Sequence, residues 1–145
     1  MRSKGDEGSR FLRLVLQSSY SELETVVDKA LSFFESQTDD MDILHKVMLL
    51  TSEAVTNGMK HGNKLDENKS VYVDFMCSDH SIEVWVEDEG DGFDREAIPD
   101  PLSSEHLMDV GGRGIFLIEQ MADEVRYEMG GRRIGIIFNI ETTDP

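Results

Sequence analysis

The sequence has few of the residues that mark several broad classes of protein. Cys77 is the one cysteine among 145 residues, so an internal disulfide and a thiolate zinc cluster are both excluded. No apolar run has the length of a membrane span, and the basic residues near the start precede no apolar stretch typical of a secretory signal. We therefore expect a soluble, cytoplasmic protein that does not enter a membrane.

Positive charge is also scarce. The chain has 14 lysines and arginines against 30 aspartates and glutamates, which gives a net charge of -16. Such a charge repels nucleic-acid phosphate and anionic lipid, so we expect no direct binding to either. It repels nucleoside triphosphates as well, and a nucleotide site in this chain therefore needs local hydrogen-bond donors, a divalent cation, or both.

Length and patterning predict one domain over residues 10–145, with residues 1–9 as a disordered lead-in. Apolar runs predict five strands, and apolar residues at helical spacing predict three helices. We expect the strands at 11–17, 71–77, 82–88, 124–129 and 134–140, and the helices at 21–36, from 39 or 40 to 62, and from 112 onward. Because short turns join most of the strands, this is an α+β pattern. It predicts a mixed, mostly antiparallel sheet with the helices on one face.

The second predicted helix carries a polar stripe. In LLTSEAVTNGMKHGN, Glu53, Asn57 and Lys60 or His61 fall along one helical face. A carboxylate there can accept a proton from an attacking hydroxyl, an amide oxygen can bind Mg2+, and Lys60 or His61 can meet phosphate charge. A stripe of this kind is by itself more often a solvated helix face. Two further motifs favour the functional interpretation.

The second motif is VEDEGDGFD, where a predicted strand ends. Asp88 leaves the strand as a carboxylate that can accept the amino hydrogens of adenine. Gly90 and Gly92 lack a β-carbon, so the backbone can approach a planar ring closely. A plain acidic turn explains these letters equally well when they are taken alone.

The third motif is GGRG, directly before the apolar pattern IFLIEQM. Gly112 and Gly114 stand at the start of a predicted helix, where backbone N–H groups and the helix dipole favour phosphate oxygens. Arg113 between them either reaches a phosphate or faces water. The segment before it, about 93 to 111, lacks periodicity and is long enough to be functional or disordered.

The order and spacing of these three motifs resemble the GHKL ATPase superfamily, and within it the bacterial anti-sigma-factor serine-protein kinases. EAVTNGMKHGN is similar to the family's N-box, DEGDG to its first glycine box and GGRG with FLIEQMADEVRY to its second. The resemblance covers about residues 10 to 141. It implies a two-layer α/β sandwich of the Bergerat type and binding of ATP with Mg2+. It also implies Glu53 as general base, Asn57 as metal ligand, Asp88 as adenine contact, and a lid at about 93–111.

The family resemblance further implies an activity and partners. Small kinases of this type phosphorylate a serine on an anti-anti-sigma protein and in another state sequester a sigma factor, so the resemblance implies transcription regulation by partner switching and a possible homodimer. Two positions depart from the family pattern: Arg132 stands where related kinases tend to have threonine, and Val110 where some have arginine. The alternative is therefore a nucleotide-dependent binding module that captures a sigma factor or another regulator without phosphoryl transfer.

Overall fold

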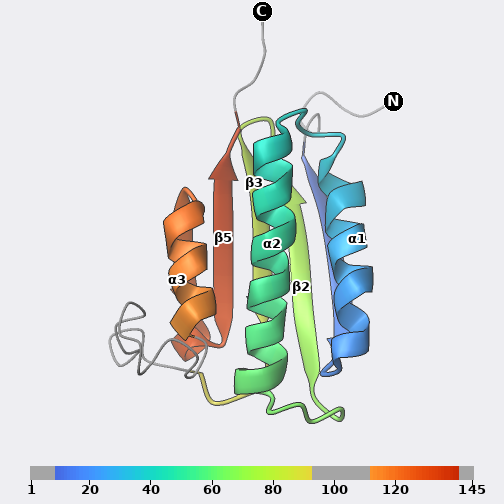
Figure 1. The fold of residues 1–145 in the computed structure, drawn as a ribbon, viewed down its shortest axis with the longest axis vertical. Coiled ribbons are helices and arrows are strands. Elements are labelled where there is room, and N and C mark those ends of the chain that lie inside the picture. Colours follow the sequence, from blue (N-terminus) through green and yellow to red (C-terminus); the bar gives the residue numbers. More distant parts are fainter. Residues whose placement is uncertain (1–8, 93–111, 141–145) are drawn as a thin grey trace, which may run out of the picture.

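The computed structural model describes residues 9–92 and 112–140, which form a sheet with helices packed on one face (Figure 1). The strands are β1 (Arg10–Gln17), β2 (Ser70–Cys77), β3 (Ser81–Glu87), β4 (Glu124–Glu128) and β5 (Arg133–Asn139). The helices are α1 (Leu23–Phe34), α2 (Met41–Asn57) and α3 (Gly112–Met121), with short turns η2 (Tyr20–Glu22), η3 (Gly58–Gly62) and η5 (Met129–Gly131). The predicted α+β class is confirmed. The lid expected at 93–111 and all but the last residue of the expected lead-in lie outside the described residues.

The sheet has the strand order β1-β2-β3-β5-β4. All pairings within the described residues are antiparallel, so the expectation of a mixed sheet was wrong in that detail. Between β1 and β2 the chain runs along α1 and back along α2, which brings it to the end of the sheet that it left, and Gln17 consequently pairs with Ser70 (Figure 1). β3 and β4 run in the same direction, but β5 lies between them.

The core lies between the sheet and the helical layer. Period-two alternation in β2 and β5 turns Val73, Phe75 and Ile136 toward the helices, where each is fully buried. Phe34 of α1 and Leu50 of α2 meet them from the other layer and are fully buried as well. Burial of each such side chain stabilises the fold by roughly 1.5–3 kcal/mol. None of the helices in the described ranges combines the length and the apolar character needed to cross a bilayer.

The long second helix begins and ends at recognisable signals. Asp40 caps α2 by accepting hydrogen bonds from the N–H groups of Asp42 and Ile43 at 3.0 and 3.3 Å. The sequence predicts one regular helix to position 62, whereas the structure changes at Gly58 into a π turn, in which the Asn63 N–H reaches the Gly58 carbonyl at 2.8 Å. Such π turns are frequent at functional sites because they shift the direction of the side chains that follow.

The sheet face turned away from the helices holds a buried carboxylate. Asp74 of β2 is 2% exposed and accepts hydrogen bonds from Nε and Nη2 of Arg13 at 2.7 and 2.9 Å. Nη2 of Arg133 in β5 lies 3.0 Å from Oδ2 of the same carboxylate, and the Arg133 guanidinium lies over the ring of Trp85. Burial raises the pKa of Asp74, but the hydrogen bonds from the two arginines outweigh burial and hold that pKa below its usual value.

We expect Asp74→Ala to lower the free energy of unfolding by about 3 kcal/mol at neutral pH, because it leaves two arginines without their carboxylate. The folded pKa of Asp74 is depressed, so its contribution is complete above the unfolded pKa of about 3.9 and is lost as the pH falls through the folded pKa. Urea unfolding should therefore show the difference between wild type and variant shrinking between about pH 4 and pH 2.

The matched control is Glu124→Ala, which removes a carboxylate paired with Arg126 where both side chains are about half exposed. That change should cost less than about 1 kcal/mol. A loss for Asp74→Ala no larger than for Glu124→Ala would contradict the stabilising role of the buried cluster.

Candidate functional site

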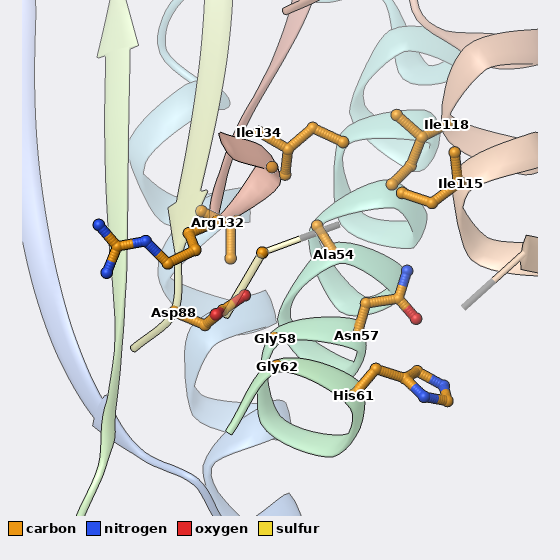
Figure 2. A pocket seen from close by; sticks show the side chains of 13 residues that line it. Ala54, Asn57, Gly58, His61, Gly62, Asp88, Ile115, Ile118, Arg132 and Ile134 are labelled. Atoms are coloured by element: carbon orange, nitrogen blue, oxygen red, sulfur yellow. The ribbon is translucent and has the colours of Figure 1, made fainter. Parts of the chain in front are cut away.

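A cavity of about 130 Å3 lies where α2, η3 and α3 meet the end of β3 and the start of β5 (Figure 2). It combines backbone and polar side chains from the predicted motifs with an apolar wall. The lining residues are Ala54, Asn57, Gly58, His61, Gly62, Val86, Asp88, Gly92, Ile115, Ile118, Gly131, Arg132 and Ile134. All three sequence motifs therefore reach one place: two contribute polar lining residues, and the helix that follows the third supplies part of the wall.

Asp88 projects into this cavity from the residue directly after β3. Its N–H donates to the carbonyl of Arg132 at 2.9 Å, which continues the pairing of β3 with β5 by one residue. Its carboxylate accepts the Gly90 N–H at 2.8 Å. Burial raises the pKa of Asp88, and the Gly90 N–H and the positive charge of Arg132 partly oppose that effect. The result is a half-buried hydrogen-bond acceptor at one end of a small cavity.

The turn η3 and the turn after β3 approach each other at Asp88 so closely that two positions have no room for a β-carbon. A β-carbon at Gly62 would lie 2.3 Å from Cγ of Asp88, and a β-carbon at Gly90 would lie 2.2 Å from the carbonyl oxygen of Gly62. Gly92 has φ +81° and faces the Gly130 carbonyl, where a β-carbon would lie 2.2 Å from the oxygen. Glycine at these positions is thus a packing requirement for the site.

The polar stripe of α2 meets the beginning of α3. A β-carbon at Gly114 would lie 2.7 Å from Nδ2 of Asn57 and 3.2 Å from Oε2 of Glu53, so both side chains lie against the first turn of α3. Within the described residues, the buried Nδ2 of Asn57 has no hydrogen-bond partner. Buried amide groups are nearly always paired, so an unpartnered amide in a cavity fits a site that awaits a polar ligand.

The basic residues predicted for the site differ in position. His61 lines the cavity and lies on the same side of the α2–η3 segment as Asn57, with Asp88 on the other side (Figure 2). Burial lowers the pKa of His61, and the charges of Lys60 and Lys64 lower it further. Lys60 is exposed and does not line the cavity.

The third motif is placed beside the cavity rather than in its lining. Gly112 begins α3, Gly114 is buried against Glu53 and Asn57, and Arg113 between them is exposed. Gly90 likewise lies next to the lining, behind Gly62.

Sequence reasoning missed the apolar wall and one polar residue. Ile115 and Ile118 of α3 face Ile134 of β5 across the cavity, and their i, i+3 spacing was a signal for a buried face but not for a ligand-facing one. Asn63, which directly follows the predicted end of the second helix, is 1% exposed and makes three side-chain hydrogen bonds beneath the site.

This fold and cavity match a known family. Residues 16–138 match the model described as the histidine kinase-like ATPase domain, and the chain belongs to that family. Two relatives are Serine-protein kinase RsbW of Bacillus licheniformis, 35% identical over 61% of this chain and 59% of the relative, and Anti-sigma F factor of Oceanobacillus iheyensis, 34% identical over 74% of this chain and 76% of the relative. The chain thus spans a little over half the length of the RsbW protein that it matches.

A solved structure supports the same architecture. The crystal structure of the RsbU and RsbW domains of a Mycobacterium tuberculosis protein superposes with a TM-score of 0.59 over 94% of this chain and 33% of that one, at 16% identity. A likeness at this identity shows the two-layer fold. An ATPase domain of this family implies ATP binding, and the cavity fits a nucleotide because it pairs an acceptor, Asp88, with an apolar wall and an unsatisfied amide on Asn57.

We expect Gly62→Ala to weaken ATP binding by at least about tenfold, because its β-carbon takes the place of the Asp88 carboxylate, and each factor of ten is a loss of about 1.4 kcal/mol. Titration calorimetry measures the affinity, and thermal unfolding checks that the fold remains. Gly58→Ala is the matched control, since a β-carbon there meets Asp88 and Val71 at 3.6 Å, an ordinary contact. Equal affinities for the two variants would show that the close approach at Gly62 does not shape the site.

Proposed function

We propose that the chain is an ATP-dependent serine/threonine-protein kinase of the anti-sigma-factor type, which transfers the ATP γ-phosphate to an anti-anti-sigma-type partner. The observation that carries this proposal is the convergence of Glu53 and Asn57 on Gly114, next to the cavity that holds Asp88. The names of the relatives, a serine-protein kinase and an anti-sigma factor, support the same class of activity.

The nucleotide is proposed to lie with its base near Asp88 and its phosphates near the start of α3. Asp88 accepts the exocyclic amino group of adenine, and Gly90 and Gly92 allow the backbone to approach the ring. The first turn of α3, with Gly112, Arg113 and Gly114, offers N–H groups and the positive end of a helix dipole to the phosphates. In an acidic chain these local donors offset the repulsion of a triphosphate.

Phosphoryl transfer assigns distinct tasks to the stripe on α2. Glu53 accepts the proton of the partner's hydroxyl as that oxygen forms a bond to the γ-phosphorus, and the bond from phosphorus to the β-phosphate oxygen breaks to release ADP. Asn57 has an amide oxygen suited to Mg2+, which when bound neutralises charge on the phosphates. Lys60 and His61 follow on the same segment and are proposed to meet the phosphate charge.

We propose one kinase domain over residues 10–145, in the cytoplasm, that acts on a protein of sheet and helix, captures a sigma factor in another state, and pairs as a homodimer. Partner switching of this kind regulates transcription without contact between the kinase and DNA, which suits a net charge of -16.

Replacing Glu53 by Gln should reduce phosphoryl transfer by a factor of about 10² to 10⁴ while ATP still binds, because the amide cannot accept the proton. Radiolabelled ATP and Mg2+ are incubated with the protein and a co-encoded small partner protein, and label on the partner is counted. Calorimetry confirms that ATP affinity is retained. Asp88→Ala is the contrasting variant and should weaken ATP binding itself.

The second candidate is a nucleotide-dependent binding module. The observation that favours it is Arg132, which lines the cavity at a position where related kinases tend to have threonine. In that case the wild type binds ATP and captures its partner, yet no label reaches the partner, and Glu53→Gln changes nothing.

We expect ATP affinity to depend on the protonation of His61. Its pKa in the protein without ligand is below the usual value of about 6.5, so near neutral pH the ring carries no charge. A bound triphosphate raises that pKa, so binding takes up a proton and becomes tighter as the pH falls through the pKa of His61 in the complex. Calorimetry in buffers of different ionisation enthalpy measures how many protons are taken up on binding. His61→Asn should remove the part of this uptake that is due to the His61 ring. Equal uptake by both proteins would remove His61 from the phosphate site.

A further inference from the structure

Asn63 connects the segments that build the site. It follows the π turn η3, and its side-chain amide is almost completely buried. Nδ2 donates to Ser18 Oγ at 2.8 Å and to the Ser70 carbonyl at 2.9 Å, while Oδ1 accepts the Glu89 N–H at 2.8 Å. One side chain therefore joins the end of β1, the start of β2 and the turn after β3.

The partners determine which way the amide points. The Ser70 carbonyl can only accept, so it requires the NH2 group, and the Glu89 N–H can only donate, so it requires the oxygen. Ser18 is also 1% exposed, and its hydroxyl donates a hydrogen bond to the Lys69 carbonyl at 2.8 Å. Both amide hydrogens and the amide oxygen are thus in use, and a rotated or shifted amide leaves buried groups unpaired.

The bond to Glu89 bears directly on the site because Glu89 follows Asp88. Asn63 itself follows Gly62, and a β-carbon at Gly62 would overlap the Asp88 carboxylate. The hydrogen bond from Glu89 to Asn63 therefore lies immediately beside the closest approach between η3 and the turn after β3. It sets how far the Asp88 carboxylate stands from η3.

We propose that Asn63 is a positioning residue of the nucleotide site, which holds the backbone of Glu89 so that the Asp88 carboxylate faces the base in the cavity. This inference rests on the proposed function, since it concerns the same site. Asn63 touches no ligand, and its effect passes through Asp88. Its role is consequently visible in selectivity for the base more than in phosphate binding.

The test compares ATP with ITP. ITP has an oxygen in place of the 6-amino group, from which Asp88 is proposed to accept a hydrogen bond. Calorimetry gives the ratio of the two affinities for wild type, Asn63→Ala and Ser18→Ala. Ser18→Ala is the matched control, because it also removes a buried hydrogen bond of Asn63 but leaves the bond to Glu89. We expect Asn63→Ala to lower the ATP to ITP ratio at least about fivefold, since misplacing one buried hydrogen-bond acceptor is an effect of this size. For Ser18→Ala we expect only a lower melting temperature.

A second pair of variants changes the same bond from its other end, at Glu89, whose side chain is exposed. Glu89→Pro removes the backbone N–H that donates a hydrogen bond to Oδ1 of Asn63. Glu89→Ala keeps this N–H and removes only the carboxylate, which accepts a hydrogen bond from the Ser70 N–H. The ratio should fall for Glu89→Pro and stay at the wild-type value for Glu89→Ala.

The double variant Asn63→Ala with Asp88→Ala should be no less selective than Asp88→Ala alone, because both changes act on one carboxylate. A ratio that is unchanged in Asn63→Ala and Glu89→Pro, or that falls equally in Ser18→Ala, overturns the positioning role and leaves the kinase proposal standing. A wild type that does not bind ATP overturns both.

Discussion

The site depends on a backbone contact that has no room for a side chain. The π turn at the end of α2 and the turn after β3 touch at Gly62, Asp88 and Gly90, and a β-carbon at either glycine would overlap the neighbouring segment. A regular α-helix would present its residues at a different angle, so the change to π geometry at Gly58 is part of this contact. Asn63 joins the two turns, because its buried side chain accepts a hydrogen bond from the Glu89 N–H.

The two faces of the sheet have different tasks around this contact. On the helical side, β3 and β5 deliver Asp88 and Ile134 to the cavity, and α3 closes the wall with Ile115 and Ile118. On the other side, Asp74 and its two arginines join β1, β2 and β5 through charge. Arg133 and Ile134 are consecutive in β5, so alternation along the strand places the charged cluster and the cavity on opposite faces of the sheet.

Much of the fold was predictable from local pattern. Alternation and helical spacing predicted five strands and three helices, and the second helix was expected to begin at 39 or 40, where Asp40 caps α2. The partners of β4 were not predictable, because strand order depends on which edge of the sheet remains open. The π turn was not predicted either, because its residues are compatible with an ordinary helix end. The feature that accompanies it, the packing of the Asp88 carboxylate against Gly62, exists only in the folded chain.

The sequence by itself determined the chemistry of the site: which carboxylates, amides and glycines the chain carries, in which order, and in a chain acidic enough that a phosphate ligand needs local donors. Only the tertiary structure decided which of these groups meet. It brought Glu53 and Asn57 to Gly114, left Lys60 and Arg113 exposed, and buried Asn63 so that its side chain accepts a hydrogen bond from the Glu89 N–H. The physical reason is distance along the chain. A motif describes neighbours within a few residues, whereas burial and hydrogen bonding between positions 63 and 89 exist only after the sheet and helices have packed.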